Sequence, residues 1–175
     1  MGRWFLNGSG PGGGSLFSAV LFLALDDPAL PELEVFMTPM TVEENLGNGE
    51  EEAAPFLERL GRRLLVRGRK VAQPGIQIDI NQERPKSLGT VRLASANPTQ
   101  HPLIDPNYLA DARDLDELVH GVHIMREVMA QPQIAKYPQG ETGVWKDAHS
   151  KSKIINAIRQ TAYTGHHPCC TARMG

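Results

Sequence analysis

The sequence predicts an α+β fold in which helices cover one face of an antiparallel sheet. Segments with strand-like alternation lie mainly in the first part of the chain, and the strongest helical periodicity lies in the last part. The regular alternation of strands and helices that builds a parallel sheet is missing from the pattern. With 175 residues, 41% of them hydrophobic, the chain is large enough to bury a core.

Three segments have the pattern of strands. Residues 33–37 are hydrophobic and β-branched and lie between two prolines. In residues 76–80, three isoleucines alternate with polar side chains, and residues 90–94 form the third segment. Because the turn-rich connection at residues 84–89 is short, we expect the last two strands to be antiparallel neighbours.

The regions between these strands have the composition of loops. The first 14 residues are rich in glycine, which predicts an exposed loop or the edge of a larger structure. The Asn97-Pro98 and His101-Pro102 pairs interrupt regular structure, and we interpret residues 104–108 as irregular. The apolar run at residues 15–25 is shorter than the roughly 20 residues that span a bilayer.

Helical patterns occur in three places. Residues 50–67 start with glutamates and end with arginines, a charge order that suits the helix dipole. Asp111 is a predicted N-cap, with Asp114 three residues further on. The helix that follows has an apolar stripe at Leu115, Leu118, Val122, Met125 and Met129. A third helix is expected at residues 151–162, with Ile154, Ile155 and Ile158 on its buried side and Gly165 after its end.

Charge and cysteine content exclude several classes of partner. The formal net charge of −2 provides no overall field that would attract nucleic acid or an anionic membrane. The basic cluster at residues 59–70 lacks interleaved aromatic side chains and fits the solvated end of a helix. Adjacent Cys169 and Cys170 cannot form a relaxed intrachain disulfide, so a reducing, cytoplasmic compartment is the simpler expectation.

Reactive side chains are concentrated at the end of the sequence, and three interpretations are open there. A neutral histidine can act as a general base, and Pro168 restrains the backbone of His167. The two histidines and two cysteines at positions 166, 167, 169 and 170 are zinc-ligand types, although adjacent pairs lack the usual ligand spacing. A structural loop with two small thiols is the third interpretation. We predict no metal.

Several blocks of the sequence are similar to the glucose-methanol-choline family of FAD-dependent oxidoreductases. Residues 84–93 resemble the family's Pro-x-Ser-x-Gly-x-Val strand pair, and residues 95–98 and 104–109 follow in the family's order. The helix that begins with Asp114-Leu115 continues the likeness. Residues 167–175 resemble the block His-Pro-x-x-Thr-x-x-Met-Gly. Residues 4–39 resemble the start of the family's substrate domain more loosely.

This resemblance implies the oxidation of a small-molecule alcohol to an aldehyde or ketone, as in choline-dehydrogenase-like enzymes. A histidine base takes the hydroxyl proton while hydride moves to N5 of FAD. His167 matches the family's active-site histidine and is the implied catalytic residue. His166, Pro168 and Thr171 are implied to lie near the substrate or the flavin. The resemblance also implies a fold of the family's substrate-binding domain type.

The sequence departs from the family pattern in several ways. Cys170 stands where glycine is common and Ala172 where cysteine is common, which changes the packing beside the histidine. We find no Gly-x-Gly-x-x-Gly motif in a strand-turn-helix context, so the Rossmann-like FAD domain is missing, and the second catalytic residue is missing too. We therefore expect a fragment that is inactive and flavin-free by itself, or alternatively a non-enzymatic binding module. Residues 1–83 would be the N-terminal part of the substrate-binding region. Residues 84–175 would be the family's C-terminal domain, truncated before the second catalytic residue.

The remaining histidines are expected to be solvated. His120 and His123 lie three apart on the predicted Asp111 helix, a spacing that can bind metal. The helical wheel places them opposite or beside the apolar stripe, which favours an exposed face. His101, between Gln100 and Pro102, is expected in a surface loop.

Overall fold

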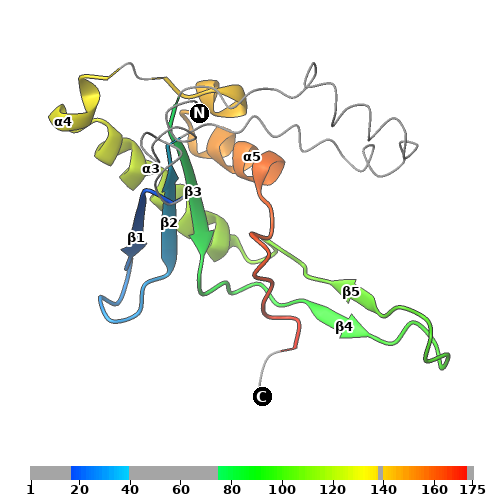
Figure 1. Ribbon diagram of the computed structural model, residues 1–175. Coiled ribbons are helices and arrows are strands. Elements are labelled where there is room, and N and C mark those ends of the chain that lie inside the picture. Colours follow the sequence, from blue (N-terminus) through cyan, green and yellow to red (C-terminus); the bar gives the residue numbers. More distant parts are fainter. Residues whose placement is uncertain (1–16, 40–74, 138–139, 173–175) are drawn as a thin grey trace, which may run out of the picture. The chain divides into compact units, whose positions relative to one another are not determined.

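The computed structural model describes residues 17–39, 75–137 and 140–172 (Figure 1). The predicted helix at residues 50–67, the glycine-rich first 14 residues and the basic cluster at residues 59–70 lie outside the described residues. Internal packing divides the chain into two units. One unit comprises residues 1–20 and 36–79, and the other comprises residues 21–35 and 80–175. All the predicted site residues belong to the second unit.

A three-stranded sheet has the order β1-β2-β3, with β1 at Ala19–Leu23, β2 at Leu33–Thr38 and β3 at Gln77–Gln82. This confirms the strands predicted at residues 33–37 and 76–80. The antiparallel course is visible in two backbone bonds, from Glu32 N–H to the Leu23 carbonyl at 3.1 Å and from Glu83 N–H to the Glu32 carbonyl at 2.8 Å. Leu33 and Val35 in β2 are completely buried, as expected for alternate positions that face a core.

A second, two-stranded antiparallel sheet pairs β4 (Thr90–Arg92) with β5 (Leu103–Asp105), with Val91 opposite Ile104. The expectation that residues 76–80 and 90–94 are sheet neighbours is therefore wrong. The physical reason is that residues 86 and 87 bind the buried carboxylate of Asp114, which pulls the connection away from a hairpin turn. The irregular structure expected at residues 104–108 is wrong for residues 104 and 105, which belong to β5, and is confirmed for residues 106–108.

Helix α3 (Ala112–Met129) has the N-cap that the sequence predicts. The Asp111 carboxylate accepts a hydrogen bond from the Arg113 N–H at 2.9 Å and binds the Arg113 guanidinium, which lowers the pKa of Asp111 to about 2. Helix α5 (Lys151–Thr161) is capped by Ser150 and also confirms its prediction. Two short elements lie between them, α4 (Pro132–Ala135) and the 3₁₀ helix η2 (Gly143–Asp147).

The core of the second unit lies between α3, η2 and α5. Its buried members are Leu115, Val119, Val122, Ala148, Ile154, Ala157 and Ile158. Helix α3 packs closely on the sheet at Gly121, where a Cβ atom would lie 2.8 Å from Leu33 Cδ1 and 3.2 Å from Ile80 Cγ2. The predicted α+β arrangement, with helices against an antiparallel sheet, is confirmed.

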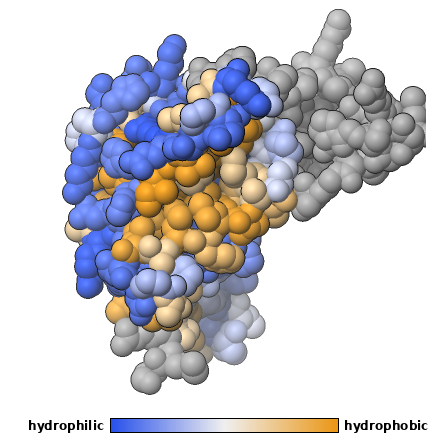
Figure 2. All heavy atoms as spheres, turned by 90° about the vertical axis from the view of Figure 1, so that its left-hand side faces the viewer, coloured by the Kyte–Doolittle hydropathy of each residue, from blue (hydrophilic) through white to orange (hydrophobic). Residues whose placement is uncertain are grey.

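Some apolar side chains remain at the surface. Val20, Leu21 and Phe22 of the edge strand β1 are exposed, and Figure 2 shows apolar residues on the side where β1 lies in Figure 1. Leu93, directly after β4, is 86% exposed. Within the described ranges, no helix combines the length and the apolar character needed to cross a membrane.

Candidate active site in the C-terminal segment

The segment after α5 turns sharply at the histidine pair. The backbone N–H of His166 donates to Thr164 Oγ1 at 2.9 Å, and that of His167 donates to the Thr164 carbonyl at 3.2 Å. Gly165 and His166 both have positive φ angles, of 58° and 63°. Residue 166 thus takes a left-handed conformation that is uncommon for residues other than glycine. Thr164 and this turn fix the backbone that carries the two imidazoles.

The structure places the four predicted site residues along this one segment. His166, His167 and Pro168 are exposed, and Thr171 is half-buried. The His167 ring is therefore open to solvent, where a reaction partner can approach it, and is not enclosed among aliphatic groups.

Two carboxylates that the sequence analysis did not single out lie on the adjoining part of the unit. Partial burial and the Glu83 carboxyl group raise the pKa of Glu34, and the charge of His167 opposes this rise. The Glu34 and Glu83 side chains are thus hydrogen-bonded to each other in this part of the unit. No local signal in the sequence links Glu34 with Glu83, because the tertiary fold brings these distant residues together.

The segment is tied to the connection before β4. The Gly89 N–H donates to the Cys170 carbonyl at 3.2 Å, and Cys170 Sγ lies 3.9 Å from the Pro85 carbonyl oxygen. Figure 1 shows the chain after α5 running toward β4 and β5. Two blocks that carry the family resemblance, separated by about half the chain, are thereby in direct contact.

The Asp114 side chain also binds the connection before β4. Its carboxylate is 1% exposed and accepts from Lys86 N–H at 2.7 Å, from Ser87 N–H at 2.9 Å and from the Ser87 hydroxyl. Gln82 Nε2 adds a further bond at 3.0 Å. The Ser87 hydroxyl oxygen in turn accepts the Asp111 N–H at 2.9 Å. The sequence analysis placed Asp114 only in the helix start and missed this buried role.

The two cysteines lie side by side as free thiols. Cys169 Sγ and Cys170 Sγ are 3.4 Å apart, with Cys169 exposed and Cys170 half-buried. Desolvation, together with the neighbouring Cys170 thiol, raises the pKa of Cys169 to about 11. In the described part of the chain, no cluster of three or more histidine, cysteine or acidic side chains could hold a metal ion. The zinc interpretation therefore finds no assembled ligand set there.

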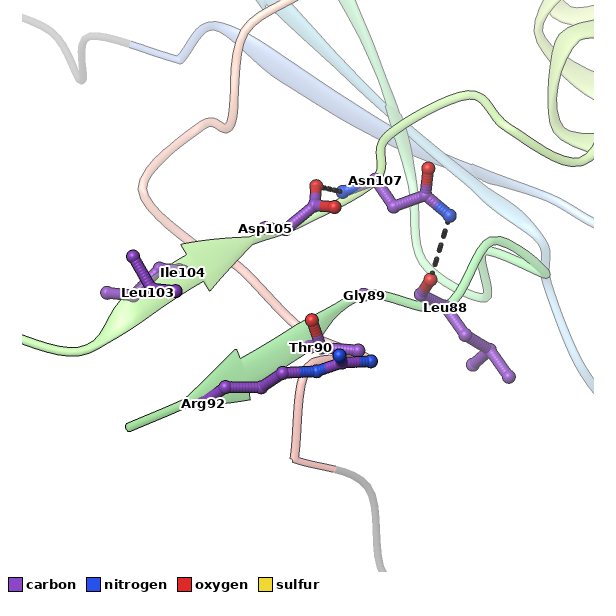
Figure 3. Close-up of a pocket in the computed structure, with 8 residues that line it drawn as sticks. All are labelled: Leu88, Gly89, Thr90, Arg92, Leu103, Ile104, Asp105 and Asn107. Carbon is purple, nitrogen blue, oxygen red and sulfur yellow. Dashed lines mark hydrogen bonds between the residues drawn. The ribbon is translucent and has the colours of Figure 1, made fainter. Parts of the chain in front are cut away.

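A shallow hollow of about 390 Å³ lies on the β4–β5 hairpin (Figure 3). Its lining residues are Leu88, Gly89, Thr90, Arg92, Leu103, Ile104, Asp105 and Asn107. Asn107 Nδ2 donates to the Leu88 carbonyl at 3.0 Å and so connects the two sides of the hairpin. None of the four predicted site residues lines this hollow, so we do not assign it to the chemistry.

The other histidines lie where the sequence predicts them. His120 and His123 on α3 are exposed, and His101 is exposed in the loop between β4 and β5. No functional role follows for these three side chains.

Comparison with known proteins supports the resemblance that the sequence indicates. A family model described as GMC oxidoreductase matches residues 85–175. The chain is 29% identical over 174 residues to the oxygen-dependent choline dehydrogenase of Paraburkholderia xenovorans (strain LB400). It is 30% identical to the enzyme of the same name from Burkholderia vietnamiensis (strain G4 / LMG 22486), and 28% identical to that of Serratia proteamaculans (strain 568). These alignments include 99% of the chain and 27%, 27% and 28% of the relatives.

The matched region is about half of the chain and contains β4, β5, both long helices and the histidine segment. The chain belongs to the GMC oxidoreductase family. It spans about a quarter of the length of the curated relatives it matches.

Proposed function

We propose that this chain forms part of an FAD-dependent enzyme that oxidises an alcohol to an aldehyde or ketone, with His167 as the general base. The observation that carries the proposal is the exposed imidazole of His167, in a block similar to the family's active-site block and inside the region that the family model matches. In this proposal, residues 84–175 belong to the C-terminal domain of the family. Residues 1–83 belong to the N-terminal part of its substrate-binding region.

The described residues suit the substrate side of such a site. A neutral imidazole near pH 7 can accept the hydroxyl proton of an alcohol. The Thr164 turn and the following proline restrain the backbone that carries the His167 ring. Bound FAD supplies the acceptor for the hydride that leaves the alcohol carbon.

Charge near His167 favours an alcohol that carries a positive charge. Glu34 and Glu83 are hydrogen-bonded to each other, and the charge of His167 opposes the rise in the pKa of Glu34 that burial and Glu83 cause. Carboxylates near a binding site attract cations and repel anions. The relatives are named choline dehydrogenases, and choline is a small cationic alcohol, so we propose choline as the first substrate to test.

The proposal can be tested in a flavin-loaded chimera. The matching segment of the Paraburkholderia xenovorans choline dehydrogenase is replaced by this chain, and FAD content is measured from its visible absorbance. Anaerobic mixing with choline is expected to bleach the flavin. His167→Asn removes the base and is expected to slow bleaching by a factor of roughly 10² to 10⁴.

The control variant is His101→Asn, which changes an exposed loop histidine and is expected to bleach at the unchanged rate. A flavin-loaded chimera in which His167→Asn reacts as fast as the parent would contradict the role of His167. Bleaching by uncharged primary alcohols as fast as by choline would contradict the preference for a cationic substrate.

A further inference from the structure

The chemistry proposed above uses neither of the two adjacent cysteines. Their sulfur atoms are 3.4 Å apart, whereas a disulfide bond is about 2.05 Å long, so a bond requires the two residues to shift closer together. Both are free, and Cys169 is exposed to reagents in solution. They are also the only cysteines of the 175-residue sequence. An intrachain disulfide can therefore form only between these two residues.

The backbone at Cys170 has an uncommon conformation. Its φ angle is 66°, in the left-handed region that favours glycine. A cysteine there carries a conformational cost that glycine would not carry.

A bond between neighbouring cysteines would be labile. Consecutive Cα atoms are about 3.8 Å apart, below the range of roughly 4.4 to 6.8 Å that relaxed disulfides span. Strained and exposed disulfides are more easily reduced and serve as regulatory or catalytic bonds, in contrast to structural ones. Such a ring is suited to opening and closing and is poorly suited to holding the fold together.

We propose that Cys169 and Cys170 form a reversible dithiol–disulfide pair that is closed by exchange with a small-molecule disulfide. Because the raised pKa of Cys169 makes its thiolate scarce near neutral pH, the exchange is favoured by alkaline conditions. There one cysteine thiolate attacks a sulfur of the reagent disulfide, forming a mixed disulfide and releasing one reagent thiol. The second cysteine thiolate then attacks the bonded cysteine sulfur and releases the second reagent thiol. The cysteine pair is oxidised, the reagent is reduced to two thiols, and the two cysteine protons end on those thiols.

Formation of the disulfide would affect Cys170, the residue that binds the C-terminal segment to residues 85–89. Cys170 accepts the Gly89 N–H through its carbonyl, and its thiol lies 3.9 Å from the Pro85 carbonyl oxygen. Forming the ring replaces the Cys170 S–H by an S–S bond, so the sulfur can no longer donate to the Pro85 carbonyl oxygen. The redox state of the pair is therefore coupled to the contact between residues 85–89 and the segment that carries His167.

The experiment uses the full 175-residue chain and oxidised glutathione as the probe. After incubation at mildly alkaline pH, remaining thiols are blocked with N-ethylmaleimide and the intact mass is measured. We expect a monomer that has lost about 2 Da, the mass of two hydrogen atoms, and takes up no maleimide. Dithiothreitol should restore the original mass and two maleimide-reactive thiols.

Two single variants serve as controls. Cys169→Ser and Cys170→Gly each leave one thiol that cannot close a ring, so both are expected to hold one glutathione or to remain maleimide-reactive. Cys170→Gly relaxes the left-handed backbone and is expected to keep the circular dichroism spectrum of the parent. Stable glutathione adducts, disulfide-linked dimers or two unreacted thiols in the parent chain would overturn the proposal.

Discussion

The Asp114 side chain connects the loop at residues 82–87 with the first turn of α3. Its carboxylate receives four hydrogen bonds from that loop and is almost completely inaccessible to water. This carboxylate is expensive to remove, because the buried N–H and hydroxyl of Ser87 then lose their partner without gaining water, although Gln82 keeps its bond to Glu117. The connection that carries Gly89, and through it Cys170, thus depends on one carboxylate.

We expect Asp114→Ala to lower the free energy of unfolding by about 3 kcal/mol, since it leaves buried donors unsatisfied. The matched control is Asp116→Ala, which removes a carboxylate two residues away that pairs with Lys151, both side chains being more than half exposed. An exposed pair contributes only about 0 to 1 kcal/mol. Urea denaturation followed by circular dichroism measures both, and equal losses would refute the assignment of Asp114.

For single residues, the sequence analysis identified the Asp111 cap but missed the Ser150 cap and the buried role of Asp114. Asp111 could be predicted because its partner, the N–H of Arg113, lies two residues away in the same turn. Asp114 accepts hydrogen bonds from residues 27 and 28 positions earlier in the chain. The pKa of Glu34 is influenced by the charge of His167, although most of the chain lies between them in sequence. Pairings over such separations follow from the tertiary fold and leave no periodic trace in the sequence.

Among the elements, helix α3 determines how closely the helical layer approaches the sheet in its unit. Gly121 lies in the interior of this helix, where glycine is unfavourable by about 1 kcal/mol relative to alanine. Its missing side chain leaves room for the fully buried Leu33 of β2. Packing at this contact therefore outweighs helix propensity.

Gly121→Ala is expected to destabilise the chain by about 1 kcal/mol. The loss from overpacking against Leu33, roughly 1 to 3 kcal/mol, is partly offset by the gain in helix propensity. Gly140→Ala, where an added Cβ would meet nothing within 4 Å, should change the stability by less than about 0.5 kcal/mol. Thermal unfolding of both variants compares them, and a stabilised Gly121→Ala variant would contradict this account of the helix–sheet contact.

The sequence predicts the positions of the helices and strands better than it predicts which strands pair. Alternation and capping located β2, β3, α3 and α5 to within a few residues, because these signals are local. The predicted pairing of residues 76–80 with residues 90–94 was wrong, since β3 pairs with β2 and β4 with β5. Gly89 shows the close approach of the second pair, because a Cβ there would meet the Asp105 carbonyl oxygen.

In the whole molecule, the family assignment rests on blocks that are distant in sequence and adjacent in the second unit. Residues 85–89 contact residue 170 directly, and both lie within the region that the family model matches. The resemblance indicated the family from the order of these blocks, and the fold supplies a physical reason for that order. The role of His167, by contrast, stays a proposal, since its chemistry requires a cofactor and a substrate beside it.

The most direct test of that role is the pH dependence of anaerobic flavin reduction by choline in the chimera that carries this chain. With His167 as the base, the rate of flavin reduction should rise with pH along a single-proton titration, because the neutral imidazole is the reactive form. In His167→Asn the rate should be low, and this titration should be absent. An unchanged pH profile in the variant would contradict the proposal that His167 takes the proton.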